Sequence, residues 1–398
     1  MRGDYQQLVD EISAVLAAPA TLEDRGFRLI AFGAHEAPEG DDRPGGPVLD
    51  PVRTRSILHR RSTTAVRDWF EAFGISRATG PLRIPADPSA GVLIGRICLP
   101  VRHRGVVHGY VWLLDDGHLA DLETGAGGGP PDPRLAQAME TAGRIGELLA
   151  AEARAGAERG ELLEDLLTAR TAARDAARAG LRSRLGGAAD GTLYLAAVVP
   201  WDPAGAEGDG GEPVPGLSGL PGALAVRAVP GQGLAVLTCP APATGAPAQA
   251  AVERLLRSPR AAGAAAGVGA PREGLDELER AWWEARAAAR AARAEPRLGP
   301  VARWEAIGPY RTLAELPPGG APDAAVAALF RPAHAELART AEVYLDHAGQ
   351  AGRAAAALAV HRQTLYYRLS RVERLTGLDL ADGEHRLLLH MALKRARL

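Results

Sequence analysis

The stretch HRQTLYYRL, residues 361–369, decides how the C-terminal part of this 398-residue chain folds. Residues 353–359 before it are rich in alanine and predict a short helix, and Val360 and His361 then form a turn. From Arg362 onward apolar residues return at helical spacing as far as Thr376, and Gly377 predicts the end of that helix. A short helix, a tight turn and a longer helix are the layout of a helix-turn-helix.

A leading helix precedes this pair in the sequence. Apolar and small residues return along one face, at spacings of four, seven, eight and eleven residues, before Gly349 stops the pattern. They are Leu337, Ala341, Tyr344, Leu345 and Ala348.

Helical spacing separates an inward from an outward face over residues 362–376. With about 3.6 residues per turn, Leu365, Leu369 and Val372 form a buried stripe. Thr364 and Arg368 lie on the flank of the opposite side, which carries Gln363, Tyr367, Ser370, Arg371 and Arg374. Gln pairs with adenine, whereas Arg pairs with guanine or with phosphate.

The outward face predicts the residues that contact DNA. Side chains at the start of such a helix reach base edges first, and later arginines contact phosphate. The expected DNA-binding residues are His361, Arg362, Gln363, Thr364, Tyr367, Arg368, Arg371 and Arg374, with Arg371 and Arg374 on phosphate. Charge and pattern alone leave a second interpretation open, a solvated Arg-rich face on a structural helical domain.

The charge of the C-terminal segment differs from that of the rest of the chain. Residues 353–398 carry nine Arg or Lys and four Asp or Glu, within a chain of net charge −2. Arginine supplies nearly all of the 46 basic residues, and Lys394 is the only lysine, which together with the excess of Ala, Gly and Pro indicates a GC-rich coding bias. Arginine content alone therefore says little, but a basic end on an acidic remainder is typical of a DNA-binding module.

Residues 337–380 closely resemble the C-terminal helix-turn-helix of the PucR/CdaR family of bacterial regulators. They carry Tyr344-Leu345-Asp346 at the end of the leading helix, the pattern His-Arg-x-Thr-Leu-x-Tyr-Arg-Leu from His361, and the tail Thr376 to Leu380. The family usually has Asn where this chain has Gln363. The resemblance implies a transcription regulator whose partner is double-stranded operator DNA.

The resemblance extends upstream and implies a multidomain α/β plus all-α fold. Residues 268–292 look like the end of the degenerate GGDEF-like domain that precedes this helix-turn-helix in many family members, and residues 1–150 are similar in layout to GAF-like sensor domains. We expect a GAF-like α/β sensor over residues 1–130, connecting or dimerising helices over 131–185, a GGDEF-like α/β domain over 186–315 and an all-helical PucR-type helix-turn-helix domain over 322–398.

Hydrophobic periodicity in the N-terminal and middle regions predicts elements that agree with these domains. Residues 91–116 hold two apolar β-branched runs around His103-Arg104-Gly105 and predict a hairpin. Residues 132–180 predict one long helix. Strands are also expected within 20–32, 193–199, 223–229, 234–237 and 264–269, and helices over 4–18, 50–73 and 275–294.

The chain shows no pattern of a catalytic or metal site. Gly210-Gly211-Glu212-Pro213 is the one Gly-Gly-acid sequence in the GGDEF-like region, and proline stands where a second acid is needed to hold metal. His103 and His108 have no third ligand near them in sequence, and the pairs Asp41-Asp42 and Asp115-Asp116 are placed in loops. Gly267-Val268-Gly269 lacks the third glycine of a dinucleotide fingerprint. We therefore expect no enzyme, no cofactor and no metal.

The sequence also predicts a compartment and partners. Cys98 and Cys239 have no metal-ligand spacing and indicate a reduced, cytoplasmic protein, and the N-terminal residues do not resemble a signal peptide. No apolar stretch is long enough to predict a membrane span. We expect a homodimer or higher homo-oligomer that responds to a small-molecule effector. Two alternatives stay open: a GGDEF-type nucleotide-signalling enzyme with an accessory DNA-binding tail, and a non-enzymatic dimerising scaffold.

Overall fold

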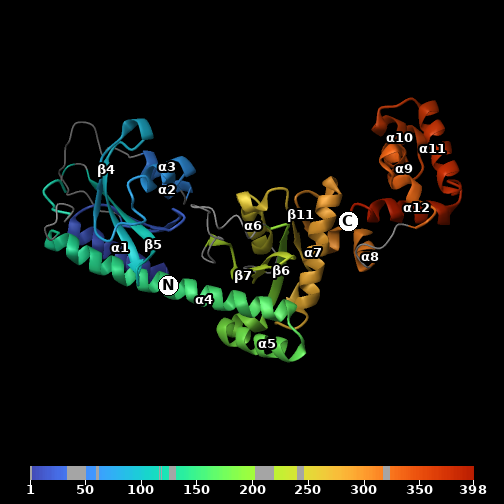
Figure 1. Cartoon of the computed structure of the whole chain (residues 1–398). Coiled ribbons are helices and arrows are strands. Elements are labelled where there is room, and N and C mark those ends of the chain that lie inside the picture. The colour runs from blue at the N-terminus through green and yellow to red at the C-terminus, as the bar shows by residue number, and fades with distance from the viewer. Residues whose placement is uncertain are drawn as a thin grey trace. The chain divides into compact units, whose positions relative to one another are not determined.

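The computed structural model divides into two compact units, one made chiefly of residues 1–158 and the other chiefly of residues 159–398 (Figure 1). Each unit has a hydrophobic core of its own. The structure describes residues 2–33, 51–59, 62–115, 117, 119–124, 131–201, 219–239, 246–316 and 323–398. Two motifs of the sequence, Gly210-Gly211-Glu212-Pro213 and Asp41-Asp42, lie outside the described residues.

A five-stranded antiparallel sheet in the order β2-β1-β5-β4-β3 forms the centre of the first unit. The predicted hairpin is present, with Arg104 and Gly105 at φ 47° and 83°, the left-handed backbone of a tight turn. Across the hairpin Cys98 lies opposite Trp112 and Leu99 opposite Val111. The strands are β1 (Ala20–Asp24), β2 (Leu29–Phe32), β3 (Leu82–Ile84), β4 (Gly95–His103) and β5 (Val106–Asp115).

The two faces of this sheet are covered by different helices. Because side chains alternate along a strand, Leu99 and Val101 join one cluster with α1 (Arg2–Leu16) and the first part of α4 (Pro133–Thr168), whereas Cys98 joins another. The second cluster is aromatic and includes residues of α2 (Pro51–His59) and α3 (Thr64–Glu71). The helical pattern expected over residues 50–73 thus contains two helices.

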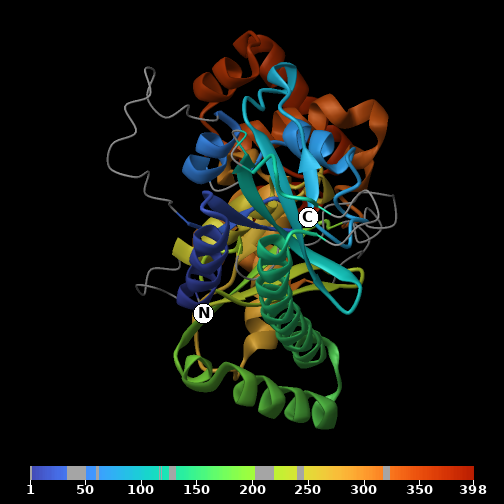
Figure 2. The same cartoon turned by 90° about the vertical axis from the view of Figure 1, so that its left-hand side faces the viewer.

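The single helix expected over residues 132–180 was wrong, because two helices, α4 and α5 (Thr171–Leu185), occupy this range. Arg170 adopts an extended backbone between them, and Figures 1 and 2 show α4 and α5 as two separate helices. Leu167 of α4 and Leu181 of α5 belong to the same core cluster. A straight helix would separate these two positions by about 20 Å, so burial of both requires the break.

A six-stranded sheet in the order β11-β9-β6-β8-β7, with β10 paired to β6, lies in the second unit, and α7 (Leu278–Ala294) packs on it. A Cβ atom at Gly267 would lie 2.0 Å from the Ala285 carbonyl oxygen, so the glycine permits close packing of strand and helix. The strands are β6 (Thr192–Val199), β7 (Ala223–Val229), β8 (Gly233–Thr238), β9 (Ala265–Val268), β10 (Arg272–Glu273) and β11 (Val301–Arg303).

The last part of the second unit is helical, as expected. Apolar side chains of α9, α10, α11 and α12 form one core cluster. The sequence predicts helical structure through residues 322–398 but gives no separate bounds for α12, whose first turn is capped by Asp382, which accepts a hydrogen bond from the His385 N–H at 2.9 Å. The remaining helices are α6 (Ala246–Leu255), α8 (Tyr310–Glu315), α9 (Ala335–Asp346), α10 (Ala351–Leu358), α11 (Arg362–Thr376) and α12 (Gly383–Arg395).

Two features are absent from the described residues. These residues contain no group of three or more His, Cys, Asp or Glu side chains that could hold a metal ion. No helix in the same residues is both long and apolar enough to cross a membrane.

Candidate nucleic-acid interface

Backbone conformation fixes the turn between α10 and α11. Ala359 is in the left-handed region at φ 53°, and the Val360 N–H donates to the Ala355 carbonyl at 3.0 Å. His361 is extended and caps α11, since its Nδ1 accepts a hydrogen bond from the Gln363 N–H at 3.3 Å. Gly377 ends α11 at φ 71°, as the sequence predicts.

The inner face of α11 is the predicted stripe. Leu365 and Val372 are fully buried and Leu369 is 6% exposed. They pack in one cluster with buried residues of the two preceding helices, including Leu337, Ala341, Leu345, Ala354 and Ala355. Helical periodicity therefore assigned the inward face of α11 correctly.

The outer face of α11 presents polar and aromatic side chains to solvent. Tyr367 is 61% exposed. Glu373 is the only acidic residue of this helix, and its Oε1 accepts a hydrogen bond from the Leu380 N–H at 3.0 Å, so this carboxylate is held by the helix end. The exposed residues of the outer face are Gln363, Thr364, Tyr367, Ser370, Arg371 and Arg374.

Three of the predicted DNA-binding residues are already engaged within the protein. Arg368 is 19% exposed and its Nη2 lies 2.5 Å from Glu336 of α9. Arg362 donates from Nη2 to the Tyr366 hydroxyl at 2.9 Å, and its guanidinium carbon lies 5.4 Å from the centre of that ring. Arg374 Nε donates to the Ser370 carbonyl at 3.3 Å. Sequence reasoning missed Tyr366, although its spacing of four residues from Arg362 was the available signal.

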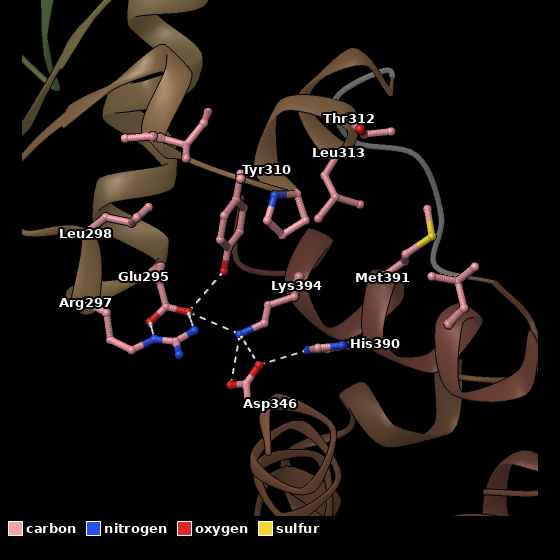
Figure 3. A pocket seen from close by; sticks show the side chains of 15 residues that line it. Glu295, Arg297, Leu298, Tyr310, Thr312, Leu313, Asp346, His390, Met391 and Lys394 are labelled. Carbon is pink, nitrogen blue, oxygen red and sulfur yellow. Dashed lines mark hydrogen bonds and ion pairs between the residues drawn. The ribbon is translucent and has the colours of Figure 1, made fainter. Parts of the chain in front are cut away.

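A second group of charged side chains, which the sequence did not predict, centres on the only lysine of the chain. We call it the Lys394 cluster: Glu295, Glu342, Asp346, Lys394 and Arg397. Lys394 Nζ lies 3.1 Å from Glu295, 3.1 Å from Glu342 and 2.9 Å from Asp346, and its side chain is 6% exposed. Arg397 Nη2 lies 2.6 Å from Glu342 and 3.3 Å from Glu295. The cluster joins α12 to α9 and to the residue that follows α7 (Figure 3).

The pKa values of Glu295 and Lys394 show that their neighbours in and around the Lys394 cluster stabilise both residues as ions. Hydrogen bonds from Arg297 lower the pKa of Glu295 to about 2, against an opposing effect of burial, and Lys394 adds to the lowering. Burial alone would lower the pKa of Lys394, but hydrogen bonds to Asp346, Glu342 and Glu295 raise it above its ordinary value. The charges of Glu295 and Lys394 are therefore retained because their neighbours compensate for the loss of solvent.

Known proteins are similar to this chain mainly in the C-terminal helices. Residues 337–395 match the PucR C-terminal helix-turn-helix domain. The carbohydrate diacid regulator of Escherichia coli (strain K12) is 47% identical over 58 residues, which are 15% of this chain and 15% of that protein. The proline-responsive transcriptional activator PutR of Bacillus subtilis (strain 168) is 25% identical over 169 residues, 41% of this chain and 36% of that protein.

One solved structure aligns with a large part of the chain. The regulator of polyketide synthase expression from Bifidobacterium adolescentis aligns with 60% of this chain and 92% of its own, at 20% identity and a TM-score of 0.29, which is too low to define a shared fold. The matched segments span only 15% and 36% of the two curated relatives, so the comparison concerns the C-terminal domain above all. Residues 337–395 are therefore similar to the C-terminal helix-turn-helix domain of PucR-type transcriptional regulators, and the similarity to named regulators rests mainly on this domain.

Proposed function

We propose that this protein regulates transcription by reading operator DNA with α11. The observation that carries the proposal is the division of that helix into a buried face and an open polar face. Leu365, Leu369 and Val372 hold the helix on its neighbours, which leaves Gln363 and Arg371 exposed on the other side. The names of the relatives, which are regulators and transcriptional activators, support the same function.

Each exposed side chain of α11 has a role that its chemistry suggests. Gln363 and Thr364 lie in the first turn, where side chains reach base edges in the major groove, and Gln pairs with adenine through two hydrogen bonds. Tyr367 lies one turn further and offers a ring and a hydroxyl. Arg371 and Arg374 come last and serve as phosphate contacts, which set affinity rather than sequence preference.

The engaged residues have supporting roles in this proposal. Arg362 is held over the Tyr366 ring, so the pair forms a preorganised donor beside the first turn. Arg368 is shared between Glu336 and a phosphate, since a guanidinium has more donors than one carboxylate uses. His361 caps the helix and offers the outer edge of its ring to the DNA backbone.

The other parts of the chain supply regulation in this proposal. The first unit, with its own sheet and core, is the GAF-like sensor of a small-molecule effector, and the domain built on β6–β11 is the degenerate GGDEF-like part. Two copies of the chain would place two α11 helices on two half-sites, about one turn of DNA apart. Such a regulator acts on the chromosome and so in the cytoplasm.

Two alternative functions, a nucleotide-signalling enzyme and a dimerising scaffold, can be distinguished from the proposed one. The family comprises regulators rather than enzymes, so no enzymatic role is proposed. The scaffold differs from the regulator in its response to salt, because binding through phosphate contacts weakens steeply as salt rises.

A footprint of the purified full chain on the DNA flanking its own gene tests the proposal. We expect a protected site whose edges are unchanged in Arg331→Ala, which alters an exposed arginine of the same helical region outside α11. Gln363→Ala should broaden the set of bound sequences without abolishing binding. Absence of any protected site at low salt would contradict the proposed function.

A further inference from the structure

A cavity of about 530 Å³ lies inside the second unit, between residues 295–313 and the helices α9 and α12 (Figure 3). Cavities of roughly 300 to 1,000 Å³ are the size that takes small organic ligands. Its walls are apolar over most of their extent, with Leu298, Ile307, Leu313, Leu387 and Met391 among the lining side chains. The proposed DNA-reading residues take no part in it.

One end of the cavity is polar and charged. Glu295, Asp346, His390 and Lys394 line that end, and Figure 3 shows their side chains directed toward one another. His390 Nε2 lies 2.9 Å from Asp346 Oδ1. An apolar chamber closed at one end by buried charges is the arrangement that orients an amphipathic molecule.

The ammonium donors of Lys394 at this end are already used. A lysine ammonium has three N–H donors, and the three carboxylates of the Lys394 cluster occupy them at 2.9 to 3.1 Å. Arg297 directs Nε and Nη2 to the two oxygens of Glu295, both at 3.0 Å. A ligand carboxylate would therefore find no free donor on Lys394.

Acceptor capacity remains on the carboxylates. A carboxylate has about four acceptor positions. Among the hydrogen bonds of the described residues, Asp346 Oδ2 accepts one, from Lys394 at 3.0 Å, and Glu295 Oε1 accepts one, from Arg297 at 3.0 Å. A ligand that donates hydrogen bonds can be added to either oxygen.

The charge balance favours the same kind of ligand. Glu295, Glu342 and Asp346 are 8%, 15% and 20% exposed, whereas Arg297, one of the cations that compensates them, is 68% exposed. The Lys394 cluster itself has three carboxylates against the two cations Lys394 and Arg397, and solvent screens the exposed Arg297 guanidinium that adds to them, so the buried groups carry more negative than positive charge.

We propose that this cavity binds a small amphipathic organic cation, an amine whose ammonium group lies at Asp346 and Glu295 and whose hydrocarbon body fills the apolar walls. Because α12 packs on both α8 and α9, and α9 packs on α11, a ligand here contacts the helices that support the DNA-reading helix. Regulation of DNA affinity by this ligand rests on the proposed function, but binding itself does not.

Calorimetric titration of the full chain, without DNA, with three probes that share one hydrocarbon body tests the inference. The probes are 3-phenylpropylamine, 3-phenylpropanol and 3-phenylpropionate. We expect one amine per chain, at least about tenfold tighter than the alcohol, and no binding of the carboxylate. Equal binding of all three, preference for the carboxylate, or no binding of the amine would overturn the inference.

Two neighbouring leucines of α12 provide a matched pair of variants. Leu387 lines the cavity and is 60% exposed, whereas Leu388 is 37% exposed and is not among the lining residues. Leu387→Trp should fill the cavity and abolish amine binding, and Leu388→Trp should leave it unchanged. If Leu387→Trp, folded as judged by circular dichroism, bound the amine like the wild type, the cavity would not be the binding site.

The two proposals fail separately. If the amine did not bind in the titration, the cavity assignment would be wrong, but DNA binding by the unliganded chain would not be affected. Loss of DNA binding with intact amine binding would contradict the DNA-reading role of α11 and leave the cavity assignment in place.

Discussion

The outer face of α11 and the Lys394 cluster use the same residue types in opposite ways. In the cluster, acids and bases from separate elements satisfy one another and are largely buried. On α11, Arg371 and Arg374 are exposed along a helix whose only acid is turned to the helix end. Buried charges that satisfy one another depend on their partners, so removal of one partner destabilises the fold, whereas charge left open on a regular surface is available to a partner.

Removal of the lysine should give the largest effect on stability. Lys394→Met leaves three carboxylates without the ammonium that they share, and loss of one partner of a buried ion pair costs about 3–5 kcal/mol. We expect the free energy of unfolding of the second unit, measured with urea, to fall by about 3 kcal/mol because Arg397 compensates in part.

Arg371→Ala is the control for this variant. An exposed surface substitution changes stability by about 0.5 kcal/mol or less. Equal unfolding curves for Lys394→Met and Arg371→Ala would show that the cluster does not hold α12 on its neighbours, and the contrast between the two regions would be lost.

Glu23, a buried acid of the first unit, shows what happens without full compensation. Burial raises the pKa of Glu23 to about 7, although a hydrogen bond from Ser56, the charge of Arg96 and a hydrogen bond from Trp112 each lower it. Trp112 Nε1 donates to Glu23 Oε2 at 3.0 Å. Glu295 of the Lys394 cluster, by contrast, has a pKa of about 2.

The raised pKa of Glu23 makes the first unit less stable as pH rises. Below the ordinary pKa of 4.5 the Glu23 carboxyl carries a proton in both the folded and the unfolded state. Between pH 4.5 and about 7 the unfolded state loses this proton first, so the free energy of unfolding of the first unit falls. Glu23→Gln removes this pH dependence. The free energy of unfolding of the variant, relative to that of the wild type, should therefore increase over that pH range by about 3 kcal/mol. Urea unfolding at several pH values measures the difference. A constant difference across pH 4 to 8, of whatever size, would contradict the raised pKa.

A smaller effect is expected at the turn that precedes α11. Ala359 is in the left-handed region at φ 53°, which costs about 1 kcal/mol for a residue with a Cβ atom and little for glycine. Ala359→Gly should therefore raise the melting temperature slightly and leave DNA affinity unchanged. A decrease in melting temperature would contradict the prediction that the left-handed backbone at Ala359 destabilises the turn.

The helix-turn-helix was predictable from sequence because its signals are local. Leu365, Leu369 and Val372 follow helical spacing and Gly377 ends the helix, so the faces of α11 follow without knowledge of distant residues. The break between α4 and α5 was missed because Ala169 and Arg170, which lie at the break, are not residues that end helices. Only the burial of both helices in one core requires the chain to turn there.

The Lys394 cluster could not be predicted from spacing. Glu295 and Asp346 lie 99 and 48 residues from Lys394 in sequence, and only the fold brings them together. The one available signal was compositional, because Lys394 is the single lysine among 46 basic residues. A compact ammonium can lie among three carboxylates, whereas the planar guanidinium of arginine prefers two-point contacts with one.

The most direct test of the central claim compares DNA binding by Arg371→Ala and Gln363→Ala across salt concentrations. If α11 reads DNA as proposed, Arg371→Ala weakens binding about fivefold at 0.15 M salt for every sequence. It also lowers, by about one, the slope of the logarithm of the binding constant against the logarithm of the salt concentration. Gln363→Ala should leave the slope unchanged and reduce discrimination at one base pair, by about 1–3 kcal/mol. If both variants bound operator and mutated sites as the wild type does, the outer face of α11 would not be the DNA-reading surface.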